Sequence, residues 1–331
     1  MGAEQYKKPR TYAVKHKNEE IRKESRSGGI FTALTDKVLA GNGVVYGCAL
    51  MSDFTAEHIR ATDRIERDRM RGSKYIQSKM GDTFSKVKED LRQRTVLFSG
   101  TPCQVAGLLS FLGEHPDNLI CVDIVCHGVP SELVWKAYLE YQEKSAQGKI
   151  VGVDFRNKQK FGWASHRETL KFLDGREIDS KVYAKLFYDH AILRLSCYQC
   201  PYKQYIHPGD ITIADYWGIE KAVPEFNDNQ GVSLVLINND RGAEMFSSVK
   251  EEIVWKETML DQSLQPPLYS SFGKPRNREQ FWKDFEERDF IEIIQKYGHD
   301  TKAQRLRKSL SRYASKVLKE CKKMELRLQK R

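Results

Sequence analysis

Four of the seven cysteines are spaced so that they could bind one metal centre. Cys197 and Cys200 form a Cys-x-x-Cys pair, and two intervening residues let both thiolates reach the same metal. Cys103 and Cys126 each lie on a turn with glycine and proline, directly after a short apolar segment. Four thiolates at this spacing satisfy either a zinc ion or a 4Fe–4S cluster. We therefore expect these four cysteines to be metal ligands.

Spacing alone leaves several interpretations of these cysteines open. Structural zinc usually takes two short ligand pairs, whereas this chain has one pair and two single cysteines. Pro201, directly after the last cysteine, is typical of ferredoxin-type sites. A thiol–disulfide enzyme would place its pair at a helix N-terminus, and ordinary buried thiols remain an alternative. The spacing favours iron–sulfur over zinc, while Cys48, Cys121 and Cys321 are interpreted as ordinary thiols.

Three glycine-containing turns could contact a second cofactor. Ser27-Gly28-Gly29 precedes a helical pattern, so its amides and the helix dipole could bind a phosphate. Gly72-Ser73-Lys74-Tyr75 combines a flexible turn with a cation and an aromatic ring. Gly100-Thr101-Pro102 would let the backbone approach a ligand at a strand end. No Gly-x-Gly-x-x-Gly or Walker sequence is present, which argues against a standard dinucleotide or nucleoside triphosphate site.

The elements that must position these residues alternate between strands and helices. Residues 95–99 and 119–125 are apolar strand patterns, each followed by a helical pattern. This alternation predicts an α/β fold with a mixed, mostly parallel sheet flanked by helices. Further strands are expected at 44–50, 57–62, 150–155, 168–172, 210–215 and 232–237, and further helices at 30–39, 131–143, 182–195, 241–251 and 278–296.

We expect four regions along the chain. They are a polar lead-in (1–26), an N-terminal α/β part with the glycine-containing turns of the second cofactor (27–150), a part that completes the metal site (151–298) and a basic amphipathic helix (299–331).

The charge of +10 is concentrated in the last region. Residues 302–331 contain 12 Lys/Arg and two Glu, and the remaining residues carry 43 basic and 43 acidic groups, so nucleic-acid binding by the body is not expected. The tail has one apolar stripe, which could pack on the body, contact a membrane peripherally or bind a partner. Its residues are Leu306, Leu310, Tyr313, Val317, Cys321, Met324 and Leu328. With no signal-like or membrane-spanning run, a cytoplasmic location is expected.

Together these stretches resemble the coenzyme F420 hydrogenase/dehydrogenase beta-subunit family, whose members bind FAD and an iron–sulfur cluster. The resemblance covers roughly residues 25–250 and raises the iron–sulfur interpretation well above zinc. Its motifs are SGGIFTAL (27–34), GSKYIQS (72–78), LFSGTPCQVAGL (97–108), DIVCHGVPS (123–131), CYQCPYK (197–203), GDITIADYWG (209–218) and GVSLVLINNDRG (231–242).

The resemblance implies roles for individual residues. Cys103, Cys126, Cys197 and Cys200 would bind a 4Fe–4S cluster. Ser27, Gly28, Gly29, Thr32, Gly72, Ser73 and Lys74 would line FAD, with Gly100, Thr101 and Gln104 between flavin and cluster. Asp215, Trp217 and Gly218 match a motif without an assigned role.

The expected function is that of an iron–sulfur flavoprotein oxidoreductase. With no cysteine before Cys48, the N-terminal ferredoxin module of many relatives is missing, so electrons would come from a ferredoxin-like partner protein. They would pass through the cluster and FAD to a small-molecule hydride acceptor, coenzyme F420 or another, and the reverse direction is equally allowed. The alternatives are a flavin-free electron-relay subunit and a zinc-stabilised interaction protein that uses the basic tail.

Overall fold

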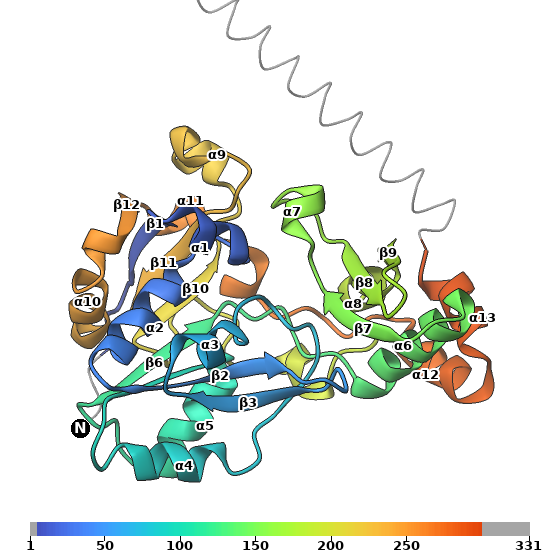
Figure 1. The fold of residues 1–331 in the computed structure, drawn as a ribbon, viewed down its shortest axis with the longest axis horizontal. Helices are drawn as coiled ribbons and strands as arrows, with labels where there is room; N and C mark the ends of the chain where they lie inside the picture. The colour runs from blue at the N-terminus through green and yellow to red at the C-terminus, as the bar shows by residue number, and fades with distance from the viewer. Residues whose placement is uncertain (1–4, 300–331) are drawn as a thin grey trace, which may run out of the picture.

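The computed structural model describes residues 5–299, which form a nine-stranded mixed sheet and a smaller lobe beside it (Figure 1). Across the sheet the strand order is β12-β1-β11-β10-β6-β5-β2-β3-β4. The four central strands, β10, β6, β5 and β2, run parallel, whereas β12, β1 and β11 are antiparallel neighbours on one side. The bounds of these strands are β1 Arg10–His16, β2 Val44–Leu50, β3 Ala56–Ala61, β4 Ser78–Lys79, β5 Val96–Gly100, β6 Leu119–Ile124, β10 Ile211–Asp215, β11 Ser233–Ile237 and β12 Ile253–Thr258.

The central strands are apolar throughout because helices cover both faces of the sheet. Side chains of a strand alternate between its two faces, so Leu97 joins the cluster beneath α2 (Ile30–Ala40) and α10 (Asp240–Ser247). Its neighbours Val96 and Phe98 join the cluster beneath α4 (Thr83–Asp90) and α5 (Pro102–Leu112). The continuous apolar run at 96–98 therefore reflects burial on both sides.

The smaller lobe surrounds an aromatic core. Trp135, Tyr138, Tyr183 and Phe281 are all at most 2% exposed, and the Trp135 and Tyr183 rings lie 4.7 Å apart between centroids. In Figure 1 this lobe lies on the right. It comprises β7 (Ile150–Asp154), β8 (Glu168–Phe172), β9 (Glu177–Ser180), α6 (Glu132–Ala146), α8 (Val182–Tyr188), α12 (Arg278–Glu287) and α13 (Phe290–Tyr297).

Short helices complete the described chain. They are α1 (Glu19–Glu24), α3 (Arg64–Asp68), α7 (Lys158–Phe161), α9 (Ile219–Ala222), α11 (Leu260–Ser263) and the 3-10 turns η1 (Leu195–Gln199), η2 (Pro224–Phe226), η3 (Lys250–Glu252) and η4 (Pro266–Leu268). Within residues 5–299, no helix is both long and apolar enough to cross a membrane.

The mixed α/β class is confirmed, and several expected elements are corrected. The lead-in contains β1, which is held between β11 and β12, so residues 10–16 are an integral part of the sheet. The helix expected at 182–195 ends at Tyr188, because His190 adopts the left-handed backbone conformation with φ of +66°. The helix expected at 278–296 is two helices, separated where Arg288 and Asp289 are extended.

The regional boundaries and the tail remain predictions. Strands from both sides of residue 150 share the large sheet, so the metal-site and flavin-site parts have a common core. The basic helix, its apolar stripe and its proposed contacts lie outside the described residues.

Candidate iron–sulfur and flavin site

Cys103 and Cys126 lie at the carboxyl ends of adjacent parallel strands. Cys103 follows β5 and is the second residue of α5, and Cys126 comes two residues after β6. The Thr101 hydroxyl oxygen lies 3.1 Å from Cys103 Sγ. A helix N-terminus favours negative charge nearby, so Cys103 is well placed to serve as a thiolate ligand.

Cys197 and Cys200 lie on a segment whose start is hydrogen-bonded to the turn that follows Cys126. Ser131 N donates to Ile192 O (2.9 Å) and Arg194 N donates to Val129 O (2.9 Å). Within this pairing, Val129 N also donates to Cys197 Sγ (3.4 Å). A backbone N–H aimed at sulfur is the kind of contact that orients a metal-bound thiolate.

Lys203 lies among all four thiols. Its side chain is buried, Nζ donates to the carbonyl oxygen of Cys126, and Cys103, Cys126, Cys197 and Cys200 each act on its charge. Burial lowers the pKa of Lys203, and these thiols oppose that effect. Burial raises the pKa of Cys126 to about 12 in the metal-free protein. The structure therefore brings together the four predicted ligands and adds a cation that the spacing did not predict.

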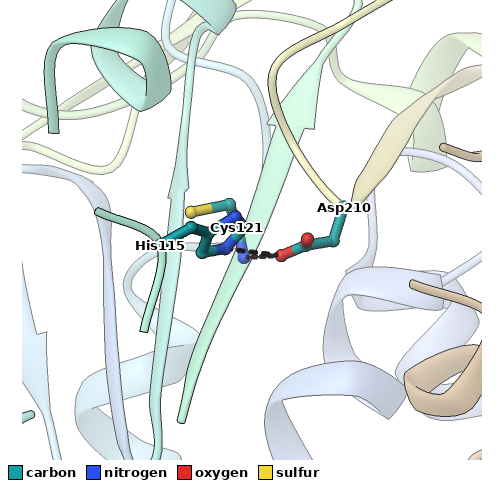
Figure 2. Close-up of side chains that lie close together, drawn as sticks. All are labelled: His115, Cys121 and Asp210. Carbon is teal, nitrogen blue, oxygen red and sulfur yellow. Dashed lines mark hydrogen bonds and ion pairs between the residues drawn. The ribbon is translucent and has the colours of Figure 1, made fainter. Parts of the chain in front are cut away.

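A second group of metal-capable side chains lies near the start of β6 (Figure 2). Of residues 5–299, only His115, Cys121 and Asp210 form a group of three or more such residues with ligand atoms within 4.8 Å of one another. Zn–S bonds of ~2.3 Å would hold tetrahedral sulfurs roughly 3.8 Å apart, so the four cysteines are too widely spaced for preformed zinc coordination. A cubane cluster binds each sulfur to a different iron and needs a wider arrangement.

Packing against neighbouring strands constrains the Ser27-Gly28-Gly29 turn. A Cβ on Gly28 would lie 2.1 Å from Val14 O, and Ser27 Oγ donates to Val232 O (2.6 Å). Gly29 has φ of +95° and precedes α2, whose N-terminus is capped by no side chain. The first-turn amides of α2 remain suitable for an anion.

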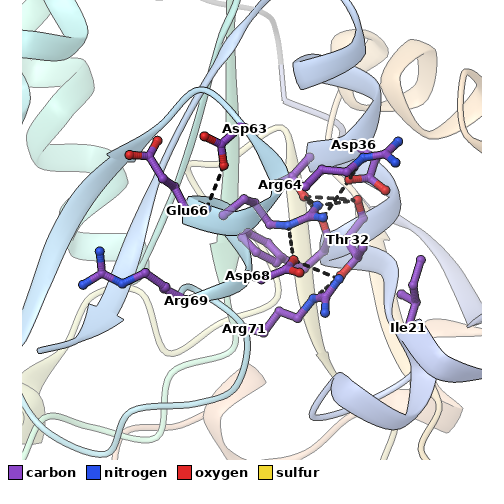
Figure 3. A network of polar contacts seen from close by, with 12 residues as sticks. Ile21, Thr32, Asp36, Asp63, Arg64, Glu66, Asp68, Arg69 and Arg71 are labelled. Carbon is purple, nitrogen blue, oxygen red and sulfur yellow. Dashed lines mark hydrogen bonds and ion pairs between the residues drawn. The ribbon is translucent and has the colours of Figure 1, made fainter. Parts of the chain in front are cut away.

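Arg67 fixes the next turn against α2. Figure 3 shows the network of polar contacts at this turn, with Thr32, Asp36 and Arg71 labelled. This guanidinium is 1% exposed, pairs with Asp36 (2.7 Å) and Asp68 (2.9 Å), and donates to Thr32 O (3.1 Å). Arg71 Nε donates to Thr32 Oγ1 (3.2 Å) in the same network. The contacts position the chain just before Gly72, whose φ is +79°, while Ser73 is exposed.

Lys74 is bonded to the backbone of the same turn. Its Nζ donates to the carbonyls of Arg71 (2.8 Å) and Arg69 (3.1 Å), so Lys74 is held rather than solvated. Burial lowers the pKa of Lys74 to about 8, against an opposing effect of Cys48. Cys48 lies opposite His58 in the β2–β3 pair, and the His58 Nδ1 atom is buried without a hydrogen-bond partner. Sequence reasoning had given neither residue a role.

Gln104 connects Ser78 with the turn that carries Cys103. Its Nε2 donates to Ser78 Oγ (2.7 Å), and its Oε1 accepts from Thr101 N (2.9 Å). A Cβ on Gly100 would lie 3.0 Å from Gln104 Oε1, so the glycine allows this close approach. Gly100, Thr101 and Gln104 therefore lie between Ser78 and Cys103, and their expected place between a flavin and a cluster stays a prediction.

A concentration of positive charge accompanies these residues. Burial and the nearby Arg26 and Arg22 charges lower the pKa of Lys158 to about 8, and Arg26 also disfavours the charge on Lys74. Lys158 Nζ donates to the carbonyls of Arg22 (2.7 Å) and Gln230 (2.9 Å). Arg22 and Arg26 are themselves paired with the carboxylates of Asp228 and Asp154, so much of this positive charge is already compensated.

The Asp215 motif joins the lobe to the sheet. Asp215 accepts from Arg156 Nη1 (2.5 Å) and from Trp163 Nε1 (2.8 Å), both of which belong to the lobe segment. Trp217 stacks on Trp163 with 4.8 Å between ring centroids, and Gly218 has φ of +92°. These residues therefore hold the two parts of the molecule together.

Comparison with known proteins identifies the family of this chain. Residues 93–263, about half of the chain, match the family described as the C terminus of the coenzyme F420 hydrogenase/dehydrogenase beta subunit. This chain belongs to the coenzyme F420 hydrogenase/dehydrogenase beta-subunit family, which relates it to part of an oxidoreductase. All four predicted metal ligands lie inside the matched span, whereas Ser27 through Lys74 precede it.

A solved structure of the F420-reducing [NiFe] hydrogenase complex from Methanosarcina barkeri, derivatised with xenon, contains a chain of similar fold. The match has a TM-score of 0.55 at 16% identity and covers 77% of this chain and 83% of that chain. At this identity the likeness concerns the fold alone. No curated protein matches the sequence.

Proposed function

We propose that this chain is an iron–sulfur flavoprotein oxidoreductase subunit. A 4Fe–4S cluster would be bound by Cys103, Cys126, Cys197 and Cys200, and FAD by the turns at residues 27–32 and 72–74. Electrons would pass between a ferredoxin-like partner protein and an organic hydride acceptor, coenzyme F420 or another.

The observation that carries this proposal is geometric: Cys103 and Cys126 follow adjacent parallel strands, and buried Lys203 bonds both Cys126 and Cys200. Ordinary buried thiols would leave this cation without any compensating charge, which is costly in a protein interior. Four thiolates bound to a metal centre carry net negative charge and would compensate it.

The flavin part of the proposal is supported by the contacts that run from Thr32 to Cys103. Arg71 bonds Thr32 and Lys74, Gln104 bonds Ser78 and Thr101, and Thr101 approaches Cys103. The chain's own residues would orient the flavin, with Lys74 available to stabilise negative charge on it. A flavin bound here would supply the exchange between one-electron and two-electron chemistry.

Anaerobic purification of the full chain tests the proposal. We expect a visible spectrum with iron–sulfur and flavin bands and about four irons, about four sulfides and one FAD per chain. Zinc without iron or flavin would support a zinc-stabilised interaction protein and refute the oxidoreductase assignment. Iron and sulfide without flavin, even after incubation with FAD, would indicate an electron-relay subunit.

A further inference from the structure

Lys203 is the most unusual charged residue in the described chain. Its side chain is 8% exposed, its N–H donates to Cys200 O (3.3 Å), and its Nζ donates to the carbonyl of Cys126. Nζ also lies 5.4 Å from the centroid of the Phe272 ring. These contacts fix a cation directly beside two segments that carry the cysteines.

No carboxylate balances this charge within residues 5–299. Other buried cations have one: Arg22 pairs with Asp228, and Arg156 pairs with Asp215. Lys203 has no acidic oxygen within 4.0 Å, and every residue that favours its charged form is one of the four cysteines. A negatively charged group bound by the cysteines would therefore supply the charge that matches Lys203.

We propose that Lys203 is the internal counter-charge of the four-cysteine centre and that it raises the reduction potential of a cluster bound there. This inference rests on the proposed function. A cluster with four thiolate ligands becomes more negative when it accepts an electron, and a fixed cation close by in a low-dielectric interior favours that change. The electron comes from the partner protein, and no bond is made or broken in the chain.

The role is one of tuning, since Lys203 is no ligand. Raising the potential eases electron entry from a partner and makes transfer onward to the flavin less favourable. Lys203 would therefore affect how electrons from the partner protein are distributed between the cluster and the flavin.

The test measures the midpoint potential of the cluster in the full chain by a redox titration monitored by electron paramagnetic resonance. Lys203→Met removes the charge, Lys203→Gln removes it but keeps a hydrogen-bond donor, and Lys203→Arg keeps it. Lys256→Met controls for net charge. Lys256 is an exposed residue of the distant strand β12 and pairs with Glu225.

We expect Met and Gln to lower the potential by at least the equivalent of a tenfold change in the one-electron equilibrium, about 59 mV. The midpoint potentials of Lys203→Arg and Lys256→Met should stay close to that of the unmodified chain. Unchanged potentials in Met and Gln at full iron content would overturn the inference. Loss of iron from both, with retention in Arg, would also overturn it and assign Lys203 to cluster assembly. Absence of iron from the unmodified chain would instead refute the proposed function.

Discussion

Each end of β6 has a group of metal-capable side chains, and the two groups differ in charge balance. Near the start of the strand, Asp210 accepts from Cys121 N (2.7 Å) and Asn239 Nδ2 (2.8 Å), with Arg241 at 4.0 Å and His115 Nε2 at 3.3 Å. Beyond its end, Lys203 faces four thiols and no carboxylate. The first group is already neutralised and bonded, whereas the second lacks negative charge. Charge balance therefore separates the two groups more clearly than ligand type does.

The largest expected difference is in iron content. Cys197→Ala should lose nearly all cluster iron, because a cubane site depends on all four cysteines. Cys121→Ala should keep full iron, since Cys121 is buried in the sheet core away from the site. Iron and sulfide analysis of both variants after anaerobic purification decides the matter, and equal iron in the two would contradict the ligand assignment.

Removal of Asp210 should cause the next largest effect, on stability. Asp210→Ala leaves the backbone N–H of Cys121 and the side-chain amide of Asn239 without their acceptor. Each buried donor left unpaired costs about 1–3 kcal/mol of unfolding free energy. Urea denaturation measures the loss, and Asp261→Ala, at an exposed carboxylate, is the control. A loss as small as that of Asp261→Ala would show that the Asp210 carboxylate does not hold its neighbours together.

Without a cluster, the charge of Lys203 should lower the stability of the folded chain. In chelator-treated, metal-free protein we expect Lys203→Met to raise the unfolding free energy by about 1–3 kcal/mol, because the buried cation then has no compensating charge. Urea denaturation of metal-free Lys203→Met and Lys203→Arg chains tests this. Equal stability of the two would argue that the cation is balanced without any metal centre.

The flavin side permits a similar test with Lys74. Lys74→Met should weaken FAD binding about tenfold, as expected for one charge-assisted hydrogen bond of about 1.4 kcal/mol. Lys74→Arg keeps the charge, and Lys79→Met changes an exposed lysine. Fluorescence titration of the flavin-free chain with FAD gives the dissociation constants, and identical constants for all three variants would remove Lys74 from the site.

The smallest effect is expected at His115. His115→Gln should change the unfolding free energy by less than about 1 kcal/mol, because Nε2 makes no hydrogen bond with good geometry. The group should also take up no cobalt, since Arg241 already neutralises Asp210. A cobalt–thiolate absorption band in the Cys197→Ala chain that disappears on replacing Cys121 would refute this comparison.

The sequence predicted the centre of the fold well because the local signals there are strong. The apolar segments at 95–99 and 119–125, each followed by a glycine- and proline-containing turn, correctly placed Cys103 and Cys126 at adjacent strand ends. Those turns are local in sequence and need no knowledge of distant pairing.

Other features depend on distant parts of the chain and gave no local signal. β12 places Val254 and Trp255 on an exposed edge among charged residues, so it lacks an apolar pattern. The Cys48–His58 pairing depends on the β2–β3 register. Lys203 could have been noticed as the cation three residues after Cys200, but nothing in the sequence shows that its side chain turns inward.

The position of β1 has a consequence for synthesis on the ribosome. This strand precedes the other described elements, yet it pairs only with β11 and β12, and β11 begins at residue 233. At 5–20 residues per second, translation from β1 to β11 takes roughly 11–45 s. During that interval the apolar Tyr12-Ala13-Val14 segment has no strand partner and is open to chaperones. The sheet can be completed only after β12 (residues 253–258) has been made.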